Sequence, residues 1–108
     1  MPRFTNYPEE FNDYLRSQVK LDNLTGEIYW TCQTLRGARN MASPLGSSHI
    51  GKYLAFRLKF NGKSYHVLNH RAVFFLTYGY WPVGVDHIDG NGFNNTPSNL
   101  RSCNQKGN

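Results

Sequence analysis

The chain has only two cysteines, Cys32 and Cys103, in 108 residues. Cysteines so few and so far apart form neither a disulfide framework nor a Cys-x-x-Cys metal site, which argues against a structural zinc ion. Long apolar runs are also missing. None approaches the roughly 20 residues of a membrane span, and the N-terminus lacks the apolar core of a signal peptide. We therefore expect a reduced, cytoplasmic protein with no membrane partner.

Acidic residues are scarce as well. The chain has 7 Asp and Glu against 12 Lys and Arg, a formal net charge of +5. A small domain with this excess attracts polyanions through counterion release and long-range attraction. The same charge is compatible with a basic surface that binds nothing. The length predicts one domain, residues 1–108, with a modest core.

The N-terminal part predicts a helix over residues 8–20, with Phe11, Tyr14, Leu15 and Val19 on one apolar stripe. A turn and a short strand over residues 27–31 follow. No period is evident from residue 33 to residue 51. This glycine- and serine-containing stretch, which carries Arg36 and Arg39, predicts a flexible loop that either orders on an acidic partner or stays solvated.

The clearest pattern in the chain is a β-hairpin. Residues 53–60 alternate strictly between apolar and polar or mixed positions, Asn61-Gly62 is the usual pair of a type I′ turn, and residues 63–68 return. The two-residue turn fixes the register and pairs Phe60 with Lys63 and Arg57 with His66. One face then gathers basic and polar groups that either contact DNA phosphates or are solvated, namely Arg57, Lys59, Ser64 and His66.

A central buried helix is expected over residues 70–78, since its apolar positions surround most of the helix. Asn69 is the expected N-cap and Gly79 the expected C-terminal stop. His70 at its start either packs structurally or approaches a phosphate, and we favour the structural role.

The last quarter of the chain predicts a strand over residues 85–88, a loop with Gly90 and Gly92, a strand over residues 99–103 and a helix that begins at Asn104. Adjacent residues of a strand point to opposite faces, so Asp86 and His87 have different roles. Phosphodiester cleavage needs a base for water and a cation for the phosphate, and histidine and aspartate can supply or hold these. Taken alone, the dipeptide Asp86-His87 could equally be part of an ordinary surface turn.

The segments Val85-Asp86-His87-Ile88-Asp89-Gly90-Asn91, Asn94-Asn95, Asn99-Leu100-Arg101 and Asn108 resemble the signature of the HNH endonucleases, most closely the homing and phage-encoded group. Residues 24–30 and 69–71 resemble the leader region of phage members. The resemblance implies an α+β protein. Its N-terminal helix and small antiparallel β-sheet (residues 1–84) lead into a C-terminal ββα-metal, or His-Me finger, motif (residues 85–108).

The resemblance also assigns roles. It implies that His87 is the general base, that Asp86 and Asn108 are metal ligands, and that Asn99 braces the loop and the histidine. Asn94 and Asn95 would tie down the glycine-rich loop. An oxygen ligand set favours one Mg²⁺ or Mn²⁺ per active site. The expected DNA-contacting residues are Arg36, Arg39, Arg57, Lys59, His66 and Arg101.

The implied function is metal-dependent cleavage or nicking of double-stranded DNA, with no small-molecule cofactor. We expect a monomer or weak dimer in a bacterial host cell, encoded by a phage or an intron. A helix that ends at Asn108 is expected to be short or frayed, which would weaken metal binding. The alternative is a DNA-binding module that keeps the HNH shape without catalysis.

Overall fold

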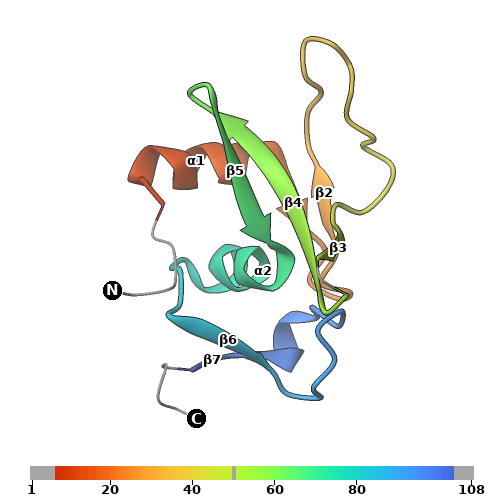
Figure 1. The fold of residues 1–108 in the computed structure, drawn as a ribbon, viewed down its shortest axis with the longest axis vertical. Coiled ribbons are helices and arrows are strands. Elements are labelled where there is room, and N and C mark those ends of the chain that lie inside the picture. Colours follow the sequence, from red (N-terminus) through yellow and green to blue (C-terminus); the bar gives the residue numbers. More distant parts are fainter. Residues whose placement is uncertain (1–6, 50, 104–108) are drawn as a thin grey trace.

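The computed structural model describes residues 7–49 and 51–103. In chain order the elements are α1 (Glu9–Gln18), β1 (Val19–Leu21), β2 (Ile28–Trp30), β3 (Ser47–His49), β4 (Tyr53–Phe60), β5 (Lys63–Leu68), α2 (Asn69–Tyr78), β6 (Gly84–His87), the short 3-10 helix η1 (Pro97–Asn99) and β7 (Leu100–Cys103). Within these residues no helix is both long and apolar enough to cross a membrane. Figure 1 shows a mixed α and β fold whose strands form three small antiparallel sheets.

Helix α1 begins after Pro8 and buries Phe11 and Leu15 completely, as the apolar stripe predicts. It ends at Gln18 rather than at Lys20, because Val19 adopts an extended conformation and pairs with Trp30 in the β1–β2 sheet. A β-branched residue suits a strand better than a helix end. Val19 is 3% exposed, so it belongs to the core as predicted.

The β4–β5 hairpin has the predicted register, with Phe60 opposite Lys63 and Arg57 opposite His66. Asn61 and Gly62 both have positive φ, 52° and 74°, as a type I′ turn requires. The loop before β4 is more regular than expected, since β3 pairs with β4 and adds an edge strand. Three residues without an apolar pattern give too weak a signal to predict such a strand.

Helix α2 is the central helix, and it contacts β4, β5, β6 and β7. Gly79 ends it in the left-handed region at φ 88°. The predicted cap was wrong: Leu68 takes the N-cap position, and Asn69 is the first helical residue. Asn69 is instead buried against the loop that precedes β3. Its Nδ2 donates a 3.1 Å hydrogen bond to the carbonyl oxygen of Leu45 in that loop.

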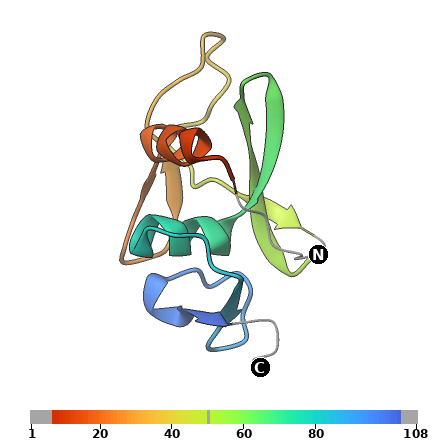
Figure 2. The same cartoon turned by 90° about the vertical axis from the view of Figure 1, so that its left-hand side faces the viewer.

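The core combines aliphatic and aromatic side chains and lies between the hairpin and the two helices, which pack on the same side of it (Figure 2). Phe75 of α2 stacks on Trp81 with ring centroids 4.4 Å apart, and the indole Nε1 of Trp81 donates a 2.7 Å hydrogen bond to Asn12 of α1. On the β4–β5 side, the rings of Phe11 and Tyr65 are in contact, with centroids 4.5 Å apart. These contacts join α1, α2 and the hairpin into one scaffold.

The β6–β7 hairpin packs below α2, as both cartoon views show (Figures 1 and 2). Asp86 lies opposite Arg101 and His87 opposite Leu100, whose side chain is buried. Strand β6 begins one residue earlier than the sequence predicts, and β7 begins one residue later. The expected helix over residues 104–108, including Asn108, lies outside the described residues, so the third element of the ββα motif stays a prediction.

Candidate active site

His87 is the last residue of β6 and is 8% exposed. Its Nε2 lies 2.9 Å from Oδ1 of Asn95, which is also buried. Because an amide oxygen only accepts hydrogen bonds, Nε2 carries the proton in this arrangement and Nδ1 keeps its lone pair. The imidazole is therefore prepared to accept a proton at Nδ1.

Two aromatic neighbours surround the His87 ring. The ring of Tyr53, the first residue of β4, is nearly parallel to the imidazole, with ring centroids 6.1 Å apart. The ring of His70 in α2 meets the imidazole edge-on, with ring centroids 5.0 Å apart. His70 is itself buried, and its Nδ1 has no hydrogen-bond partner within the described part of the chain. Burial, together with the charges of His87 and Arg71, lowers the pKa of His70 to about 4. His70 is therefore a neutral packing partner of His87 at physiological pH.

Asp86 points to the other face of β6, as strand alternation predicts. Its Oδ2 accepts hydrogen bonds from Nε and Nη2 of Arg101, at 3.1 and 2.8 Å, whereas Oδ1 accepts none from residues 7–49 and 51–103. Arg101, which the sequence assigns to DNA, is thus paired with a carboxylate. About half of the Asp86 side chain is exposed, so its free oxygen is accessible to a further ligand.

Asp89 organises the loop between β6 and β7. Its carboxylate accepts hydrogen bonds from the Asn94 and Asn99 side chains and the Asn91 backbone, and these bonds lower its pKa to about 2. Asn99 donates a second bond to the Asn94 carbonyl, and its own amide oxygen accepts from the Asp89 backbone. Asn99 therefore braces the loop, while the direct contact with His87 comes from Asn95.

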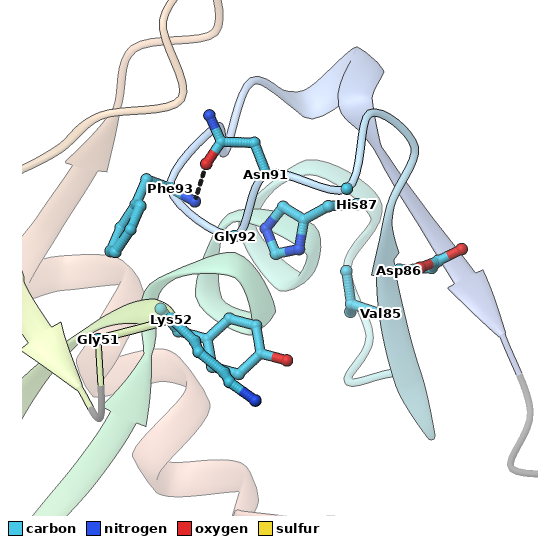
Figure 3. A pocket seen from close by; sticks show the side chains of 10 residues that line it. Gly51, Lys52, Val85, Asp86, His87, Asn91, Gly92 and Phe93 are labelled. Atoms are coloured by element: carbon cyan, nitrogen blue, oxygen red, sulfur yellow. Dashed lines mark hydrogen bonds between the residues drawn. The ribbon is translucent and has the colours of Figure 1, made fainter.

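A cavity of about 470 Å³ opens beside His87. Figure 3 shows the imidazole reaching into it, whereas the Asp86 carboxylate points toward the far side of β6. Its walls come from both halves of the chain, and its lining residues are Gly51, Lys52, Tyr53, Val85, Asp86, His87, Gly90, Asn91, Gly92 and Phe93. Sequence reasoning missed Lys52 and Tyr53, because only folding brings the start of β4 to the motif.

The remaining basic candidates lie on two segments. Arg57, Lys59 and His66 are exposed on the outer face of the β4–β5 hairpin, and Arg36 is exposed on the loop before β3. Arg39 of that loop is half-buried: its guanidinium lies 3.8 Å from the Trp30 ring and donates to Gln18. The structure thus leaves Arg36 accessible and uses Arg39 to hold the loop against β2.

Metal ligands of the usual clustered kind are not found in the described residues, since no group of three or more His, Cys, Asp or Glu side chains gathers there. The donor set available at β6 is a carboxylate oxygen of Asp86. A hard cation would fit this oxygen if an amide oxygen and DNA phosphate oxygens completed its shell. The chemistry of the site is compatible with magnesium or manganese.

Comparisons with known proteins agree with the motif. Residues 67–108 match the family described as HNH endonuclease. A solved structure described as "DNA binding and cleavage by the HNH homing endonuclease I-HmuI" is similar, with a TM-score of 0.58 and 29% sequence identity over 82% of this chain. The chain corresponds to 48% of the length of that protein, and no curated protein matches it in sequence. The two matches confirm the resemblance of this chain to the HNH endonucleases.

Proposed function

We propose that this protein is a metal-dependent endonuclease that hydrolyses phosphodiester bonds of double-stranded DNA. The observation that carries the proposal is the buried His87, whose Nε2 is held by Asn95 while its ring faces a cavity shared with Asp86. The similarity to a homing endonuclease that binds and cleaves DNA supports the choice of substrate. This chain spans about half of that protein. We therefore base the proposed activity on the residues of this chain and not on the activity of the longer protein.

His87 is the proposed general base. Nδ1 takes a proton from the water molecule that attacks the phosphorus atom, and Asn95 keeps the ring in the required tautomer. Tyr53 and His70 hold the ring plane from two sides. Asn99 and Asn94 keep the loop between β6 and β7 in place through Asp89.

Asp86 and Asn108 are the proposed ligands of one Mg²⁺ or Mn²⁺ ion. When bound, such an ion offsets negative charge on the phosphate and on the leaving 3′-oxygen. Oδ1 of Asp86 is the oxygen available to it, since Arg101 binds Oδ2. Arg101 fixes the direction of the carboxylate and limits its rotation.

The proposed DNA-binding surface runs along β4. Tyr53 lines the cavity, and Arg57 and Lys59 follow on the same side of the strand because side chains alternate with a period of two. At about 3.3 Å per residue, these two cations lie about 13 and 20 Å further along the strand. They would contact phosphates further along the duplex from the cleaved bond, with His66 paired to Arg57 across the hairpin. Arg36, on the loop before β3, is the remaining exposed cation proposed for this surface.

A second candidate is a DNA-binding module without catalytic activity. The ion pair between Arg101 and Asp86, at 2.8 Å, is the observation that favours it, since it partly neutralises the proposed metal ligand. The basic hairpin face would serve this function equally. Such a module would act as a monomer or weak dimer on duplex DNA, as would a nicking enzyme with one site.

Incubation with supercoiled plasmid separates the two functions. The endonuclease converts the plasmid to the open circular form in Mg²⁺ or Mn²⁺ and leaves it intact in excess EDTA. Asp86→Asn should remove most of this activity while DNA affinity in EDTA is retained. Salt-sensitive DNA binding without nicking in either metal would establish the module instead.

A further inference from the structure

We propose that Lys52 binds the DNA phosphate that is being cleaved, from the wall of the cavity opposite Asp86. The inference rests on the proposed endonuclease function and adds a substrate-contacting residue to it. Lys52 lies outside the motif, in the connection between β3 and β4.

The position of Lys52 is the first observation. Among the described residues that line the cavity, it is the one lysine or arginine. Figure 3 shows it across the cavity from Asp86, with the His87 ring between the two walls. A phosphate that approaches the His87 imidazole through this cavity therefore passes a wall that carries an ammonium group.

The backbone of Lys52 is held against the motif. Gly92 of the loop between β6 and β7 lies so close to Lys52 that a Cβ at Gly92 would overlap the Lys52 carbonyl oxygen and lie 3.0 Å from Cδ1 of Tyr53. The next residue, Tyr53, is fixed by its pairing with His49 in the sheet. The Lys52 backbone is thus fixed relative to His87, whereas its exposed side chain is free to follow a phosphate.

The charges at the cavity leave Lys52 available. Arg101 is the nearest cation to Asp86 in the described residues and is bound to its carboxylate. Lys52 makes no ion pair in the part of the chain that the structure describes. Attack on a phosphodiester adds negative charge to the phosphate oxygens, and an ammonium group placed beside them stabilises that charge more than it stabilises the ground state.

The test compares Lys52→Met with Lys63→Met, an equal charge change at the far end of the β4–β5 hairpin. Both side chains are exposed, so both variants should melt like the parent chain. We expect Lys52→Met to lower kcat/KM for plasmid nicking about 10- to 100-fold, because it removes one charged donor from the transition state. Lys63→Met should stay within about threefold of the parent.

A second measurement does not depend on cleavage. In EDTA, the slope of log Kd against log salt for a short duplex should fall by about 1 for Lys52→Met and remain unchanged for Lys63→Met. If the parent chain nicks DNA and Lys52→Met behaves like Lys63→Met in both assays, the Lys52 proposal is overturned and the endonuclease stands. If the parent chain never nicks but Lys52→Met loses one unit of slope, the endonuclease fails and the phosphate contact stands.

Discussion

Nε2 of His87 lies 2.9 Å from Oδ1 of Asn95, and both side chains are buried. This contact joins the last residue of β6 to the far end of the following loop. It determines which imidazole nitrogen carries the proton, and so which one keeps the lone pair for the proposed role as a base. The asparagine that orients the histidine is therefore Asn95, and Asn99 acts one step away by bracing the loop.

Replacement of Asn95 by Leu should slow DNA cleavage. The change keeps the branching and the number of side-chain heavy atoms but removes the acceptor, which leaves the His87 N–H buried and unpaired at a cost of about 1–3 kcal/mol. We expect the single-turnover nicking rate to fall about 10- to 100-fold with DNA affinity retained, since the ring loses its fixed tautomer. Asn40→Leu, on an exposed loop, is the control. An Asn95→Leu rate equal to that of the control would show that this contact does not orient the base.

Gly26 should resist substitution more than Gly37 does. Both have positive φ, 78° and 67°, so alanine strains the backbone at either position. Only at Gly26 would the new Cβ also overlap the backbone of Asn95, whereas Gly37 has open space around it. We expect Gly37→Ala to cost about 1–2 kcal/mol and Gly26→Ala at least 2 kcal/mol more, roughly, in urea unfolding. Equal losses would contradict the close packing of the β1–β2 turn on the site loop.

His70 should make stability depend on mild acid. Its pKa is about 4 in the folded protein against 6.5 for a free histidine, so between these values the unfolded chain binds the proton and the folded chain does not. The free energy of unfolding should therefore be fully retained above pH 6.5 and fall as the pH decreases to 4, by up to about 3 kcal/mol from this residue.

Urea unfolding from pH 7 to pH 4.5 measures this dependence. His70→Phe keeps a ring beside His87 and Tyr53 but cannot be protonated, so its curve should be flatter than that of the parent chain. The account of His70 is wrong if His70→Phe loses as much stability in acid as the parent.

Loss of the two hairpin cations should weaken DNA binding without affecting the fold. Arg57 and Lys59 are exposed, so the double change to Ala should leave the melting temperature nearly unchanged. If both contact phosphates, the slope of log Kd against log salt should decrease by about 2, measured by fluorescence anisotropy with a duplex. An unchanged slope would place the DNA on another face.

The hairpin shows what local sequence signals can predict. Asn61-Gly62 and strict alternation predict the turn and the register of β4 and β5, and both were confirmed. Helix α2 was predicted for a similar reason, since Gly79 ends it and its apolar residues surround it. Where short-range patterns are strong, tertiary contacts rarely alter the local secondary structure.

Contacts between distant segments could not be predicted in this way. Asn69 has the residue type of a helix cap, but burial against Leu45 draws it into the first turn. Asp86 and His87 were recognised from the motif, whereas Lys52, Tyr53 and His70 reach the same region only because β4 and α2 pack against β6. The spacing of residues in the sequence does not predict that β4 and α2 pack against β6.

His87→Ala tests the central claim most directly, with plasmid nicking in Mg²⁺ or Mn²⁺ and duplex binding in EDTA measured on the same preparation. The account predicts that the variant binds DNA with the parental affinity and salt dependence but no longer nicks the plasmid, because the base that activates water is gone. Nicking by His87→Ala at the parental rate would contradict a catalytic role for His87.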